Sequence, residues 1–73
     1  MEKRVIYQIR IKGILDKRWS SELHGMTIVV EDDGNTCLTG PLPDQAALHG
    51  ILNIIRDLNL KLVSVKSMDS FSN

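Results

Sequence analysis

Residues 41–66 constrain the fold more than any other part of the chain, because they read as a loop, a capped helix and a strand: PLPDQAALHGILNIIRDLNLKLVSVK. Asp44 is a good N-cap, since its carboxylate can accept hydrogen bonds from the free N–H groups of the first turn. Asn59 tolerates the left-handed conformation that ends a helix, and Leu60 can then fold back onto the last turn. At about 100° per residue, the apolar side chains between these two positions fill one arc of a helix: Ala47, Leu48, Ile51, Leu52, Ile54, Ile55 and Leu58. The pattern predicts a helix that begins after Asp44 and ends before Asn59, followed by a strand over residues 60–67.

Three earlier segments have the features of strands. Residues 5–12 alternate, which predicts a strand with one buried face formed by Val5, Tyr7, Ile9 and Ile11. Residues 26–31 predict a second strand, with Met26, Ile28 and Val30 on one face. The sequence DDGN at 32–35 is a strong turn signal, because Gly and Asn tolerate positive φ. Residues 36–40 predict a short third strand, which Pro41 and Pro43 end because proline cannot donate to a ladder.

Residues 16–24 allow two interpretations. Asp16 can cap a two-turn helix that stops at Gly25, with Trp19 and Leu23 spaced to face the core together. The alternative is an ordered loop.

The order strand, short helix, strand, strand, helix, strand is the split βαβ pattern of ferredoxin-like α+β domains (βαββαβ), which places both helices on one sheet face. If residues 16–24 form a loop, the alternative is a three-stranded antiparallel meander followed by a helix and a strand. In either case we expect one small domain over residues 1–68 and a frayed polar tail over residues 69–73.

The chain has 73 residues, 42% of them hydrophobic and 25% charged, so it forms a single small domain that is either marginally stable or helped by association. The lone Cys37 excludes an internal disulfide and is expected to be a small buried side chain. The charged, alternating N-terminal segment resembles neither a signal peptide nor a membrane span, and we expect a cytoplasmic protein with no membrane contact.

Charge is unevenly distributed although the formal net charge is zero. Six of the nine basic residues lie within residues 1–18, against two acidic residues there. A solvated surface or complementarity between copies explains this bias, but an anion held by Arg10 and Lys12 is an alternative. The sheet face that would carry these two residues has no aromatic side chain for base stacking, which argues against RNA binding.

Chemistry-bearing residues are few. His24 and His49 are the only histidines, no cluster has the spacing of a metal site, and there is no Gly-rich phosphate loop. We therefore predict no catalytic residues, no metal and no cofactor, and the sequence favours a non-catalytic protein over an enzyme.

Gly50 is the anomaly of the main helix, because glycine in a helix interior costs about 1 kcal/mol relative to alanine. One explanation is that Trp19 packs over Gly50, and the other is that a ligand or a second subunit approaches there. The candidate ligand or partner contacts are Arg10, Lys12, Trp19, His49, Gly50 and Arg56.

Over residues 7–66 the chain resembles a widespread group of small bacterial and archaeal proteins of unknown activity. The resemblance depends on Trp19, on Gly25-Met26-Thr27 and on DGNTCLTGPLPDQAALHGILNIIRDLNLKLVSV at residues 33–65. The group often has Gly where this chain has Asn59, and both residues suit a left-handed cap. The resemblance implies a shared fold and says nothing about catalysis.

The sequence therefore favours an interaction or regulatory module that forms a homodimer and binds a small anionic ligand. One alternative is a small enzyme whose active site, built around His49 or Arg56, lies at a subunit interface and contains Gln45. Another is nucleic-acid binding through the basic N-terminal strand.

Overall fold

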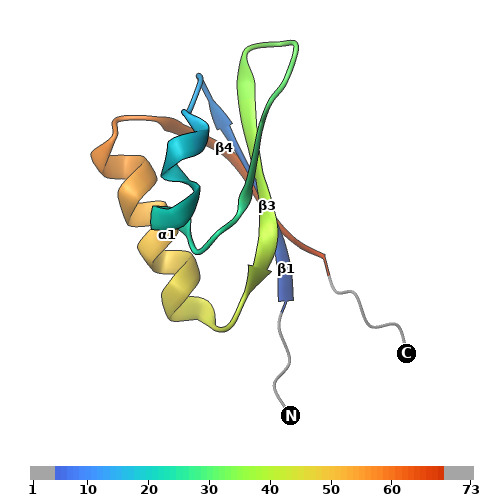
Figure 1. The fold of residues 1–73 in the computed structure, drawn as a ribbon, viewed down its shortest axis with the longest axis vertical. Coiled ribbons are helices and arrows are strands. Elements are labelled where there is room, and N and C mark those ends of the chain that lie inside the picture. The colour runs from blue at the N-terminus through green and yellow to red at the C-terminus, as the bar shows by residue number, and fades with distance from the viewer. Residues whose placement is uncertain (1–4, 69–73) are drawn as a thin grey trace.

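The computed structural model describes residues 5–68, which form an α+β domain with a four-stranded antiparallel sheet and one α-helix (Figure 1). The predicted tail at residues 69–73 lies outside the described residues. In chain order the elements are strand β1 (Val5–Lys12), the 3₁₀ helix η1 (Lys17–Leu23), strands β2 (Thr27–Val30) and β3 (Asn35–Leu42), helix α1 (Gln45–Asp57) and strand β4 (Lys61–Met68).

The strands lie in the order β2-β3-β1-β4, and each neighbouring pair is antiparallel. The meander alternative is wrong, because it would place β2 between β1 and β3, whereas β3 lies between β1 and β2. β1 is therefore a central strand, and β2 and β4 are the two edges of the sheet.

One face of the sheet carries the core. Ile9 and Ile11 of β1 are fully buried there, as predicted, whereas Val5 and Tyr7 of the same predicted face are only partly buried. Both η1 and α1 lie on this side of the sheet, and the opposite side has no helix over it (Figure 1). The buried cluster joins side chains from both helices and all three of the strands β1, β2 and β3: Ile9, Ile11, Leu15, Leu23, Met26, Ile28, Leu38, Leu42, Ala47, Ile51 and Ile55.

Residues 17–23 form a 3₁₀ helix, which settles the choice between a helix and a loop. Asp16 caps it as predicted, because its Oδ1 accepts a hydrogen bond from the Arg18 backbone N–H at 2.9 Å. This hydrogen bond is the main reason that the pKa of Asp16 is lowered, and the Arg18 charge adds to the effect. The segment ends in two consecutive residues with positive φ, His24 and Gly25.

The hairpin joining β2 and β3 has the predicted turn, in which Gly34 adopts positive φ and the Gly34 N–H donates to the Glu31 carbonyl. Ile28 is buried as predicted, but Val30 is 41% exposed, because it ends a short strand at the edge of the sheet.

The prediction that Pro41 ends the third strand is wrong, because β3 continues to Leu42 with Pro41 opposite Ile6. β2 pairs only with residues 36–39 of β3. At Pro41, β3 therefore has one neighbouring strand instead of two, and a proline is tolerated there as it is on an edge strand.

Helix α1 has the predicted ends. The Asp44 carboxylate accepts a hydrogen bond from the Ala47 N–H at 2.9 Å. At the other end Asn59 adopts φ 62°, and the N–H groups of Asn59 and Leu60 donate to Arg56 and Ile55 respectively, as in a Schellman motif. This sharp stop returns the chain to the sheet as β4, alongside β1.

Candidate functional site

Strand β4 carries more of the exposed large hydrophobic residues than any other element of the described domain. β4 pairs with β1 on one side only, and it carries four of the large hydrophobic residues that remain exposed. Their exposed fractions are 45% for Leu62, 50% for Val63, 37% for Val65 and 40% for Met68. We refer to residues 61–68 along this unpaired side as the β4 edge.

An irregularity in the β1–β4 pairing places two of these residues, Leu62 and Val65, on the same face of the sheet. The register shifts between Arg10 and Ile11, so Leu62 lies opposite Ile11 and Val65 lies opposite Ile9. Directly opposed residues share a face, so Leu62 and Val65 are both on the helix side, although in a regular strand residues three apart would point in opposite directions. Ile9 and Ile11 are completely covered, whereas Leu62 and Val65 lie one strand further out and stay more than one third exposed.

The β4 edge is not among the candidate sites predicted from the sequence. The sequence does contain an indication of this edge, because the segment LKLVSVK at residues 60–66 has apolar residues at both odd and even positions. That pattern suggested burial on both faces, whereas the structure combines a register shift with exposure at the sheet edge.

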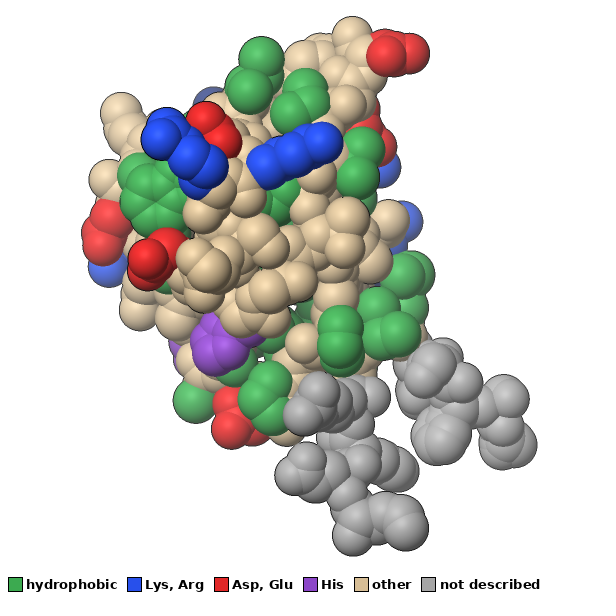
Figure 2. Space-filling view, in the orientation of Figure 1, with side chains coloured by type: hydrophobic (Ala, Val, Ile, Leu, Met, Phe, Trp, Pro, Cys, Tyr) green, Lys and Arg blue, Asp and Glu red, His purple; other side chains and the backbone are tan. Residues whose placement is uncertain are grey.

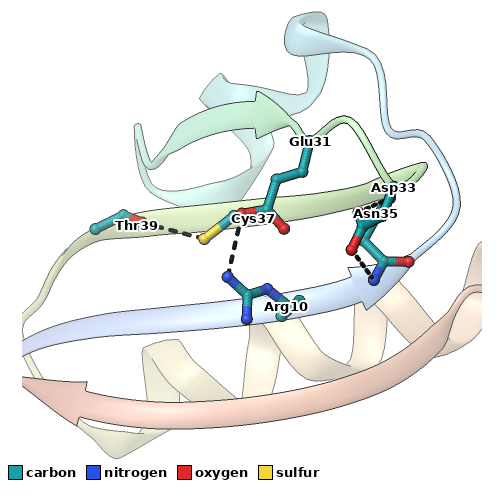
Figure 3. Close-up of polar contacts among 6 residues, drawn as sticks. All are labelled: Arg10, Glu31, Asp33, Asn35, Cys37 and Thr39. Carbon is teal, nitrogen blue, oxygen red and sulfur yellow. Dashed lines mark hydrogen bonds and ion pairs between the residues drawn. The ribbon is translucent and has the colours of Figure 1, made fainter.

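Arg10 and Lys12 do lie on the face without helices, but they do not form one anion site. Arg10 Nη2 lies 3.1 Å from Glu31 Oε2, so its charge is already compensated within the chain (Figure 3). The hydrogen bond that Arg10 donates to the Glu31 carboxylate, followed by the Glu31 charge, raises the pKa of Arg10. Lys12 instead lies directly opposite Lys61 of β4.

Cys37 lies opposite Arg10 on β3 and is buried, as predicted for a lone cysteine. Its Sγ lies 3.7 Å from Thr39 Oγ1 on the same strand (Figure 3). The neighbouring Arg10 Nε is buried and has no hydrogen-bond partner within residues 5–68. This part of the sheet thus has a structural ion pair with a thiol beside it.

The helix residues predicted to contact a ligand are spread along α1. His49 and Arg56 are both exposed on α1, but they are seven residues apart, which separates them by about 10 Å along the helix axis. The explanation of Gly50 by Trp19 is wrong, because a Cβ added at Gly50 would meet no atom within 4 Å. Trp19 packs against the core instead and lines a shallow hollow with Arg18 and Glu22 on η1.

The surface seen in Figure 2 has hydrophobic and charged side chains interspersed, with no continuous field of one charge. Within residues 5–68, no three His, Cys, Asp or Glu side chains are placed to hold a metal ion. No helix in this part of the chain is long and apolar enough to cross a membrane.

Comparison with known proteins identifies a family. The family model "Domain of unknown function (DUF8691)" matches residues 6–66, which include most of β1 and β4 and all of the elements between them. Neither a curated protein nor a solved structure matches the chain. Because the matched region covers most of the 73 residues, the chain belongs to the family described as Domain of unknown function (DUF8691).

Proposed function

We propose that the protein is a small, non-catalytic interaction module that acts as a homodimer joined at the β4 edge. The observation that carries the proposal is an eight-residue edge strand with exposed apolar residues and, among residues 5–68, no partner strand on its outer side. An edge strand presents unpaired N–H and C=O groups, and adding a strand there supplies both hydrogen bonds and apolar contact.

The two edges of the sheet differ in length, and the difference favours β4 over β2 as the dimer interface. β4 spans eight residues, or about 27 Å, whereas β2 spans four residues, or about 13 Å. A short edge strand is one device by which proteins avoid unwanted pairing, and β2 has that device. β4 carries Lys61 and Lys66, which restrict pairing to partners and registers that accommodate their charge.

A homodimer also suits the size of the domain. A 73-residue chain buries a small share of its surface, so covering exposed residues such as Leu62 and Val65 adds appreciably to stability. Each Å² of apolar surface removed from water contributes about 25 cal/mol.

We also propose a ferredoxin-like fold class and a cytoplasmic location. The strand order β2-β3-β1-β4, with η1 between β1 and β2 and α1 between β3 and β4, supports a ferredoxin-like split βαβ arrangement in which η1 replaces the first helix. The free, buried thiol of Cys37 is compatible with a reducing compartment, and we include a cytoplasmic location in the proposal.

Light scattering tests the homodimer, with the mass measured over a range of protein concentrations. We expect a dimer for the wild type and a shift toward monomer for Val63→Lys, which places a charge in the β4 edge. Val29→Lys is the matched control, because Val29 is 51% exposed, close to the 50% of Val63, but lies on β2 at the other edge. A wild type that stays monomeric at high concentration would refute the homodimer. Dissociation by Val29→Lys and not by Val63→Lys would place the interface elsewhere.

We also propose that a small anion binds at Lys12 and Lys61, in place of the predicted pair of Arg10 and Lys12. Lys12 and Lys61 face each other across β1 and β4, and like charges in that position are unfavourable unless something compensates them. Titration with inorganic phosphate, followed by NMR, should shift the backbone amides of both residues. Lys61→Gln should abolish the shifts, and Lys66→Gln, five residues along the same strand, should leave them in place. An unchanged spectrum of the wild type at millimolar phosphate would exclude this ligand.

A further inference from the structure

We infer that β4 pairs antiparallel with β4 of a second copy and that the two-fold axis passes Val65, giving one eight-stranded sheet. The inference rests on the proposed homodimer and specifies its register. The described β4 offers a small number of possible registers, and charge and side-chain direction discriminate among them.

Symmetry limits where the axis can lie. In a two-fold pair of antiparallel strands the interface is self-complementary, so one residue must lie opposite its own copy. Opposed residues must also share a face of the sheet. The β1–β4 register places Ser64 and Lys66 on the face without helices, opposite Arg10 and Gln8, and Val65 on the helix side.

An axis at Lys66 is disfavoured by charge. It would place the Lys66 ammonium group directly opposite the same group of the second copy, and like charges directly opposite in a sheet are destabilising. Lys66 has no acidic partner within 4 Å in the described part of the chain, so nothing there offsets the repulsion.

An axis at Ser64 is disfavoured because it would oppose side chains that lie on different faces of the sheet. It would pair Lys66 with Leu62 of the second copy, but Lys66 is on the face without helices and Leu62 is on the helix side. An axis at Ser67 pairs only residues 66–68 within the described strand.

An axis at Val65 avoids these conflicts. Lys66 then lies opposite Ser64 of the second copy, on the same face of the sheet. Val65 lies opposite its own copy, and a pair of β-branched apolar side chains is favourable in that position. Pairing extends over residues 63–67 of each copy, and both α1 helices lie on the same side of the joined sheet.

Disulfide trapping tests the register in the full chain. Directly opposed residues of an antiparallel pair have Cα atoms about 4.5–5.5 Å apart, within the range that a disulfide spans, whereas diagonal positions are about 7–8 Å apart. Val65→Cys should therefore give a covalent dimer under mild oxidation. Ser64→Cys is the control, because it leaves Lys66 in place and lies diagonal to its own copy. Wild type controls for the buried Cys37.

The possible results distinguish a wrong register from a wrong interface and from the absence of a dimer. Efficient trapping by Ser64→Cys in preference to Val65→Cys would refute the Val65 axis and leave the β4 interface standing. A wild type that is dimeric by light scattering with neither variant trapped would refute β4 pairing. A monomeric wild type would refute the homodimer itself.

Hydrogen exchange on the wild type gives a second test that needs no substitution. Raising the protein concentration should slow exchange of backbone amides within residues 63–67 that point away from β1, and leave the exposed amides of β2 unchanged. Slowing at β2 alone, or at neither edge in a dimeric sample, would contradict the inference.

Discussion

Gly50 lies in the interior of helix α1. An added Cβ at Gly50 meets no atom within 4 Å, so the glycine has no packing role within the described chain. Gly50→Ala should therefore raise the free energy of unfolding by about 0.5–1 kcal/mol, because alanine loses less backbone entropy in a helix. Urea denaturation measures this change. A loss of stability or of dimer mass would instead indicate that another molecule lies against Gly50.

The lowered pKa of Asp16 predicts that the stability of the domain depends on pH. Its pKa is lowered in the folded state, so its contribution to stability is present above the unfolded-state pKa and is lost as the pH falls through the folded-state pKa. Asp16→Ala should therefore be less stable than the wild type at pH 7, and the difference should shrink below the ordinary aspartate pKa of about 3.9. Thermal unfolding at several pH values checks this, and a difference that does not depend on pH would contradict it.

At the scale of elements, the N-cap of α1 supports a large part of the core. Asp44 satisfies a free N–H of the first turn, and the helix it starts buries Ala47, Ile51 and Ile55. Asp44→Ala should lower the free energy of unfolding by about 0.5–2 kcal/mol, and Asp44→Asn, which can still accept, should cost less. Chemical denaturation of the two variants measures the difference, and equal losses would show that the cap hydrogen bond is not the cause.

The features of helices and strands that depend on nearby residues could be predicted from the sequence, whereas those that depend on distant contacts could not. The ends of α1 and the alternation of β1 depend on neighbours within a few residues, so Asp44, Asn59 and Ile9 were placed correctly. The length of β3 past Pro41 depends on where β2 ends, and the exposure of Val65 depends on the place of β4 at the edge of the sheet. The Arg10–Glu31 pair joins residues 21 positions apart, and no local pattern in the sequence identifies such a contact.

At the scale of the whole molecule, association should be visible in thermal stability. A ligand that binds only the folded state raises the melting temperature with its concentration, and in a homodimer the second copy acts as that ligand. The melting temperature of the wild type should therefore rise with protein concentration, whereas that of Val63→Lys should change much less. Calorimetry over a hundredfold concentration range checks this. Equal slopes for the two proteins would argue against the β4 edge as the interface.

The pairing of Ile6 with Met68 has a mechanical consequence for the domain. These residues lie opposite each other near the beginning of β1 and the end of β4, so the chain enters and leaves the sheet at the same end through adjacent strands. A force applied between these two points would load the β1–β4 ladder one hydrogen-bonded pair at a time, starting at Met68, instead of shearing all pairs at once. The domain should open at low force, by peeling away the same strand that carries the exposed edge.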